Sequence, residues 1–211
     1  MKRYFLFVII CFSFLGLITA YAQKKFNKKV IVIDPGHGGS DPGTIYKDIY
    51  EKDIVLKISL YLKEELQKKG YIVYLTRDSD YDLSSPNATY RKKSDFDNRI
   101  KIINNYADYY LSIHLNYLND SRYSGIQVFS MNSNKEDALK MQEYLNSKLQ
   151  SNRKIKAIPN NTYMYKRLDK PGLLIECGFL SNVSERNMLL KDEYQKKLAK
   201  VIANGMSNIN F

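Results

Sequence analysis

Cysteine and acidic residues are both scarce in this chain, and each scarcity narrows what the protein can be. Only Cys11 and Cys177 occur among its 211 residues, too few for the disulfide framework of a small secreted scaffold. Lys and Arg number 33 against 22 acidic residues, a formal charge of +11. We expect such a basic chain to bind a polyanionic partner, which could be nucleic acid, an acidic membrane or an acidic cell wall.

Motifs for nucleotide binding and for serine hydrolysis are also missing. A glycine-rich stretch covers residues 36–43, but a Gly-x-Gly-x-x-Gly pattern that starts at Gly36 meets Asp41 at its last position. No Gly-Lys-Ser/Thr triplet follows, and no Gly-x-Ser-x-Gly elbow occurs. We therefore expect these glycines to permit tight backbone turns rather than to hold phosphate.

Residues 1–22 have the pattern of a Sec-type signal peptide. Met1-Lys2-Arg3 is basic, an uncharged apolar run follows, and Ala20-Tyr21-Ala22 is a small-x-small cleavage pattern. The run of roughly 17 residues is also close to the length that spans a bilayer, so an N-terminal membrane anchor is the alternative. Residues 23–29 form a basic linker. Both alternatives predict an exported, extracytoplasmic protein, which favours the cell wall over nucleic acid and limits membrane contact to the N-terminal segment.

After the linker, apolar runs alternate with amphipathic segments. The runs predict strands at 30–33, 71–76, 109–114, 125–130 and 173–177. Apolar residues at helical spacing predict helices at 51–69, at about 94–105 and from Glu193 onward. A further helix is expected to begin at a cap at Ser133 and to carry Leu139, Leu145 and Leu149 on its apolar face. This alternation is typical of an α/β fold. We expect residues 30–211 to form a single domain with a twisted, mostly parallel sheet of about six strands and helices on both faces.

Residues that carry chemistry gather where three predicted strands end. His37 follows the first strand, His114 ends the third, and Glu176 lies in the late strand. Ligands of open α/β sheets bind beyond the carboxyl ends of the strands. These are the only two histidines of the chain, and two imidazoles with a carboxylate are a common ligand set for one catalytic Zn²⁺. The sequence therefore predicts a zinc site, with two hydrogen-bonded core histidines as the alternative.

We expect the carboxylates of this site to have two different roles, metal binding and proton transfer. Glu51 opens the first helix and can turn into the crevice as a metal ligand, and Asp48 and Asp53 are alternatives with a shorter reach. Glu176 is the candidate general base, because it could take a proton from water and deliver it to a leaving nitrogen. Cys177 is expected to face the core, since adjacent strand residues point to opposite faces. Helix capping by Glu51 and a paired structural role for Glu176 are the alternatives.

Four ordered segments carry a resemblance to a known family. Residues 31–43 read IVIDPGHGGSDPG, residues 51–53 read EKD, residues 111–116 read LSIHLN, and residues 174–182 read LIECGFLSN. Together they resemble the motifs of the zinc-dependent N-acetylmuramoyl-L-alanine amidases of the type-three amidase family. This resemblance implies that residues 30–211 are an amidase catalytic domain.

The resemblance also implies a role for each candidate residue. His37, Glu51 and His114 would hold the zinc. Glu176 would activate the water that attacks the amide between N-acetylmuramic acid and L-alanine. The substrate would be peptidoglycan glycan strands with stem peptides.

The subgroup follows from size and from short stretches. Only residues 117–124 separate the second histidine motif from the next predicted strand, which leaves no room for a long occluding insertion. The stretches SIHLN, SGIQVF and ECGFLSN resemble the germination-specific amidases of the spore cortex, which act before muramic-δ-lactam forms. Because no wall-binding module is recognised, we expect an accessory or targeting protein among the partners. A catalytically inactive wall-binding or scaffold protein is the alternative function.

Overall fold

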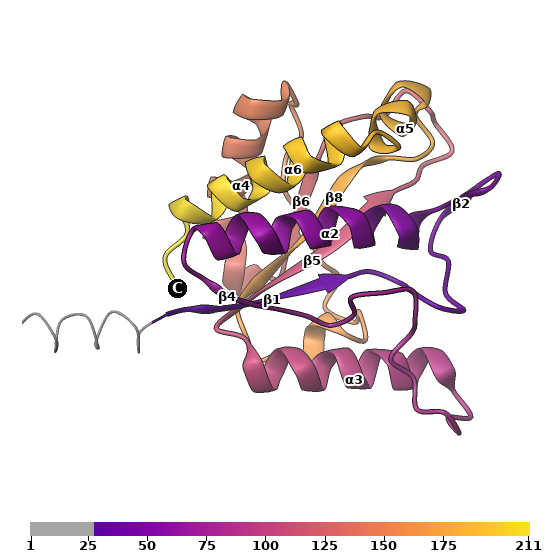
Figure 1. Cartoon of the computed structure of the whole chain (residues 1–211). Coiled ribbons are helices and arrows are strands. Elements are labelled where there is room, and N and C mark those ends of the chain that lie inside the picture. Colours follow the sequence, from indigo (N-terminus) through magenta and orange to yellow (C-terminus); the bar gives the residue numbers. More distant parts are fainter. Residues whose placement is uncertain (1–27) are drawn as a thin grey trace, which may run out of the picture.

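The computed structural model describes residues 28–211 (Figure 1). The predicted signal peptide or anchor at 1–22, and most of the linker at 23–29, lie outside the described residues. Within residues 28–211, no helix combines the length and the apolar character that crossing a membrane requires.

A six-stranded sheet forms the centre of the structure, in the order β4-β1-β5-β8-β6-β7. Its strands are β1 (Val30–Pro35), β4 (Ile72–Leu75), β5 (Tyr109–Asn116), β6 (Gln127–Ser130), β7 (Lys156–Ala157) and β8 (Gly172–Phe179). Neighbouring strands are parallel except for β6 and β8, which are antiparallel. The expected single α/β domain with a mostly parallel sheet is confirmed.

Helices cover both faces of this sheet. Figure 1 shows α2 (Glu51–Lys68), α4 (Lys135–Leu149) and α6 (Asp192–Gly205) on one face and α3 (Arg91–Tyr106) on the other. The shorter elements are the hairpin strands β2 (Ile45–Tyr46) and β3 (Ile49–Tyr50), helix α5 (Val183–Leu189), and the 3₁₀ turns η1 (Asn132–Asn134), η2 (Tyr165–Arg167) and η3 (Met206–Asn208).

The alternation of side chains along the central strands builds a core on each face. In β1, Ile31 and Ile33 belong to the larger apolar cluster beneath α2, α4 and α6, whereas Val32 belongs to the smaller cluster beside α3. All three are fully buried. A strand covered on both faces has to be apolar at successive positions, which explains the unbroken run Val30-Ile31-Val32-Ile33.

The predicted start and inner face of α4 are partly wrong. Ser133 lies in the 3₁₀ turn η1, and α4 begins after Asn134. Leu139 is 50% exposed, whereas Met141 and Leu145 are buried. Six residues turn an α-helix through about 600° at 3.6 residues per turn, so Leu139 and Leu145 cannot share a face.

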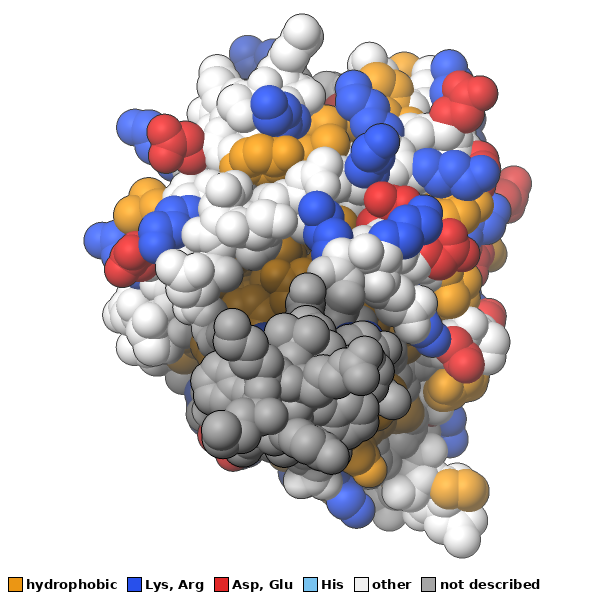
Figure 2. Space-filling model, turned by 60° about the vertical axis from the view of Figure 1, so that its left-hand side comes forward, with side chains coloured by type: hydrophobic (Ala, Val, Ile, Leu, Met, Phe, Trp, Pro, Cys, Tyr) orange, Lys and Arg blue, Asp and Glu red, His pale blue; other side chains and the backbone are white. Residues whose placement is uncertain are grey.

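The surface carries its basic residues in a dispersed pattern. On the face that Figure 2 shows, Lys and Arg side chains are interspersed with acidic and uncharged ones. Several basic residues form ion pairs within one helix, such as Lys140 with Glu136 and Lys196 with Asp192. Because the basic residues are dispersed, the charge pattern alone does not show which of them could bind a ligand.

Candidate active site

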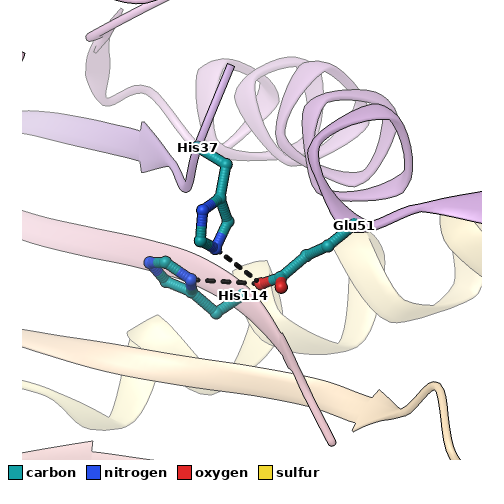
Figure 3. A group of neighbouring side chains, drawn as sticks. All are labelled: His37, Glu51 and His114. Carbon is teal, nitrogen blue, oxygen red and sulfur yellow. Dashed lines mark hydrogen bonds and ion pairs between the residues drawn. The ribbon is translucent and has the colours of Figure 1, made fainter. Parts of the chain in front are cut away.

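The carboxyl ends of the neighbouring strands β1 and β5 bring the two histidines together. His37 lies in the loop after β1, His114 lies in β5, and Glu51, the first residue of α2, reaches between them (Figure 3). The Glu51 Oε1 atom lies 3.1 Å from His37 Nε2 and 3.2 Å from His114 Nδ1. One ligand atom from each of the three residues lies within 4.8 Å of the others. This group could hold a metal ion.

Backbone amides fix the orientation of the Glu51 carboxylate. Its Oε2 atom accepts a hydrogen bond from the Thr44 N–H (2.8 Å), and its Oε1 atom accepts one from the Leu115 N–H (2.9 Å). Glu51 is 2% exposed. Asp48 and Asp53, the alternative ligands, are exposed and lie outside the group.

Two glycines allow these side chains to approach so closely. A Cβ atom on Gly36 would lie 2.3 Å from Cε1 of His114. A Cβ atom on Gly43 would lie 2.6 Å from Cδ2 of His37 and 2.8 Å from Oε2 of Glu51, and Gly43 also has a φ of +68°. Only glycine fits both positions without displacing a member of the group.

Asp41 orients His37 from the side away from Glu51. The Asp41 Oδ2 atom lies 2.9 Å from His37 Nδ1, and its Oδ1 atom accepts a hydrogen bond from the Gly43 N–H. A carboxylate on the other ring nitrogen is the usual support for a metal-ligating histidine, because it fixes the tautomer and leaves Nε2 free to coordinate. No sequence pattern predicted this role for Asp41, although the residue lies inside the IVIDPGHGGSDPG motif.

Two buried arginines hold the backbone of the loop that carries His37. Arg77 donates from Nε to the Pro35 carbonyl (3.1 Å) and from Nη2 to the Gly36 carbonyl (2.8 Å). Arg99 donates to the carbonyls of Pro35 and His37. His37 has a φ of +62°, which is uncommon for a residue with a side chain. The guanidinium groups therefore stabilise a backbone conformation that aims the His37 ring.

Hydrogen bonds shift the pKa values of His37 and Glu51 in opposite directions. Burial lowers the pKa of His37, but the hydrogen bonds with Asp41 and Glu51 outweigh it and raise the pKa to about 9. Burial acts in the opposite sense on Glu51, yet its hydrogen bonds with His114 and His37 hold the pKa of that carboxyl far below its ordinary value. A metal ion therefore competes with a proton on His37, as metal ligands generally require.

Glu176 faces the same cleft from the next strand. It is paired in register with His114 of β5 and with Gln127 of β6. Its Oε2 atom is buried and has no hydrogen-bond partner among the described residues. Burial, together with the negative charge of Glu51, raises the pKa of Glu176 to about 7 despite the opposing charge of His114. A carboxyl with this pKa can both accept and donate a proton near neutral pH.

The expected core position of Cys177 is confirmed. This residue is 1% exposed and belongs to the larger core cluster, whereas its neighbour Glu176 lines a cleft of about 280 Å³ together with His37 and His114. The remaining wall is largely aromatic and apolar, and includes Phe96, Tyr163, Met164, Tyr165 and Leu174.

The comparisons with known proteins agree with this arrangement. The sequence model of the Amidase_3 family, described as N-acetylmuramoyl-L-alanine amidase, matches residues 31–208. The chain belongs to this family. The expected family and enzyme class are thereby confirmed.

A curated relative and two solved structures give the degree of likeness. The chain is 40% identical over 188 residues to the germination-specific N-acetylmuramoyl-L-alanine amidase of Bacillus subtilis (strain 168), covering 84% of this chain and 78% of that protein. The CwlD amidase of Clostridioides difficile, solved in complex with the GerS lipoprotein, matches with a TM-score of 0.79 and 38% identity over 85% of this chain and 97% of that one. The catalytic domain of CwlV from Bacillus (Paenibacillus) polymyxa var. colistinus matches with a TM-score of 0.73 and 28% identity over 85% and 96%.

Proposed function

We propose that this chain is a zinc-dependent amidase that cleaves the bond between N-acetylmuramic acid and L-alanine in peptidoglycan, with His37, Glu51 and His114 as metal ligands and Glu176 as the catalytic acid and base. The observation that carries the proposal is the convergence of the first three side chains within 4.8 Å at a cleft that Glu176 also lines. Family membership supports the reaction.

The donor set fits zinc. Two imidazole nitrogens and one carboxylate oxygen are a frequent protein ligand set of catalytic zinc sites, which keep a further position open. The hydrogen bond between His37 and Asp41 supplies the outer carboxylate that such ligands usually have. When bound, zinc would act as a Lewis acid toward the amide carbonyl and lower the pKa of water.

Glu176 moves the proton in this proposal. Its buried Oε2 atom has no partner among residues 28–211 and is therefore free to accept a proton from the attacking water. The same carboxyl then donates that proton to the nitrogen of the departing L-alanine. The raised pKa of Glu176 suits a group that has to perform both steps near neutral pH.

The names of the relatives support a biological setting for this activity. One is named germination-specific, and we place this chain in spore-cortex maturation, in a step toward muramic-δ-lactam. The CwlD structure contains the GerS lipoprotein, which supports an accessory protein for this chain as well. We assign residues 1–22 to a signal peptide or anchor and 30–211 to the catalytic domain, with action outside the cytoplasm as for other cell-wall amidases.

The test compares the full-length wild-type chain with Glu176→Gln and His114→Ala on purified peptidoglycan, with zinc or with a chelator. We expect the wild type to release intact stem peptides with a free L-alanine amine, identified by mass spectrometry, only when zinc is present. Glu176→Gln should bind zinc normally but lose roughly 10²–10⁴ in rate, the usual contribution of a positioned acid or base. His114→Ala should lose both zinc affinity and activity.

The alternative function makes a different prediction. A wall-binding or scaffold protein would bind zinc and peptidoglycan yet release nothing, even after addition of an extract that supplies accessory proteins. That outcome would overturn the catalytic assignment.

A further inference from the structure

Lys92 is the accessible cation of the cleft. Among the described residues that line the cleft, the basic side chains apart from the histidines are Lys92 and Arg99. Arg99 is 2% exposed and its guanidinium is taken up by Asp34, Asp95 and loop carbonyls. The Lys92 side chain, by contrast, is 53% exposed. A ligand that enters the cleft can therefore reach the Lys92 ammonium but not the Arg99 guanidinium.

The ammonium of Lys92 is held close to the metal-ligand group. It donates to Oδ2 of Asp41, the same oxygen that lies 2.9 Å from His37 Nδ1. It also lies 4.9 Å from the centroid of the Phe96 ring, where it makes a cation–π contact. Lys92 is thus two hydrogen bonds away from the His37 ring, on the α3 side of the cleft.

A second cavity continues from this point. It has a volume of about 350 Å³ and shares Lys92 with the cleft, while Ser40, Asp82 and Arg91 form part of its wall. Arg91 is occupied by a two-oxygen contact with Asp82. Lys92 therefore lines both the cleft and the second cavity.

The peptide half of the substrate carries a group that suits this position. In stem peptides, the residue after L-alanine is a glutamate linked through its γ-carboxyl, so its α-carboxylate is free unless it is amidated. Residues are spaced by about 3.8 Å, which places this carboxylate within roughly two residue lengths of the scissile nitrogen. A carboxylate forms its strongest hydrogen bonds with a charged donor.

We propose that Lys92 determines specificity by binding this α-carboxylate, and that it thereby directs the peptide half of the substrate toward α3. The inference rests on the proposed function and adds the orientation of its substrate. The exchange is chemically balanced, because the ammonium gives up one carboxylate, Asp41, for another, while Asp41 keeps its bonds to His37 and to the Gly43 N–H. The flexible lysine stem allows this small movement.

The test crosses one substitution with one change in the substrate. Lys92→Met removes the charge but keeps an unbranched side chain. The matched control is Lys101→Met, an exposed lysine of the same helix. The zinc-loaded full-length variants are assayed on two synthetic muramyl peptides that differ only in an α-carboxylate or an α-carboxamide on the second residue.

We expect the wild type to prefer the carboxylate peptide by about tenfold in kcat/KM, as for one charge-assisted hydrogen bond. Lys92→Met should lose this preference, mainly through a higher KM for the carboxylate peptide, so that its kcat/KM values for the two peptides become about equal. Lys101→Met should behave as the wild type on both peptides. Any effect of Lys92 on zinc through Asp41 is common to both substrates and cancels in their ratio.

Two results would overturn the assignment. An equal loss on both peptides would mean that Lys92 acts only through Asp41 and His37, and unchanged kinetics would mean that its ammonium does not contact the substrate. A wild type that cleaves neither peptide nor whole peptidoglycan would instead remove the proposed function, and the Lys92 role with it.

Discussion

Asp34, at the end of β1, is a buried carboxylate that links the sheet to the candidate site. It accepts hydrogen bonds from Thr76 Oγ1 (2.7 Å), Arg99 Nη1 (2.7 Å) and Ser112 Oγ (2.9 Å). Burial alone would raise its pKa, but the charge of Arg99 and the Thr76 hydrogen bond lower it below the ordinary value. Because Arg99 also holds the His37 carbonyl, this ion pair supports both the core and the loop of the candidate metal ligand.

Replacement of Asp34 by Asn should therefore be costly. It leaves the buried Arg99 charge without a main partner, and we expect the free energy of unfolding at pH 7 to fall by about 3–5 kcal/mol, measured by urea denaturation of the metal-free protein. The lowered pKa of Asp34 means that its contribution is complete above the unfolded-state pKa of about 3.9 and is lost as the pH falls through the folded-state pKa. The difference between wild type and variant should thus narrow in acid. A difference that is constant from pH 7 to pH 3 would contradict this account, and Asp53→Asn, at an exposed position, is the control.

At the scale of elements, α5 secures the antiparallel pair of strands. Its residue Glu185 is 8% exposed and accepts hydrogen bonds from the Gly125 N–H (2.7 Å), just before β6, and from the Phe179 N–H (2.8 Å), at the end of β8. Asn182 caps the helix by accepting from the Glu185 N–H (3.0 Å). Glu176 lies three residues before Phe179 in β8 and is paired with Gln127 of β6, so α5 stabilises the strand that positions the candidate base.

Truncation of this carboxylate tests the role of α5. Glu185→Ala would leave two backbone amides without their acceptors, and at about 1–3 kcal/mol for each buried unpaired group we expect a loss of roughly 2–6 kcal/mol in unfolding free energy. Glu185→Gln keeps one acceptor oxygen and should lose about half as much. Hydrogen exchange should accelerate at the Gly125 and Phe179 amides in Glu185→Ala. Unchanged exchange at both amides would show that the contacts do not secure the strands.

At the scale of the whole molecule, a bound metal would tie together three separate parts of the fold. His37 belongs to the loop after β1, Glu51 to α2 and His114 to β5. A ligand that binds only the folded state stabilises it by mass action. Zinc should therefore raise the stability of the entire domain rather than of one loop.

The melting temperature measures this linkage. Free zinc at 100 times its dissociation constant stabilises a protein by about 2.7 kcal/mol, which for a chain of this size corresponds to a rise of roughly 5–10 °C. We expect this rise in the wild type and in Glu176→Gln, its reversal by chelator, and its absence in His114→Ala. An equal rise in His114→Ala would show that zinc binds elsewhere.

Much of this molecule was predictable because the governing patterns are local. Apolar runs and helical spacing indicated β1, β5, β8, α2 and the α/β class, since burial on one or both faces dictates which positions are apolar. The two-residue period of a strand likewise separated Glu176 from Cys177. Short elements such as β7 and α5, with two and seven residues, are too short to show a clear periodicity of apolar residues. The antiparallel orientation of β6 depends on its pairing with β8, which the residues of β6 alone do not indicate.

The residue pattern predicted the family and placed His37, His114 and Glu176 at the ends of strands, but it gave no order of the strands within the sheet. The family resemblance already favoured Glu51 over Asp48 and Asp53 as the third ligand. The contacts of Asp41 with His37 and of Lys92 with Asp41, by contrast, became apparent only in the folded chain. The physical reason is that a side chain contributes to such a group through interatomic distances of about 3 Å. Those distances depend on how a helix packs against the sheet, and no local pattern of residues encodes them.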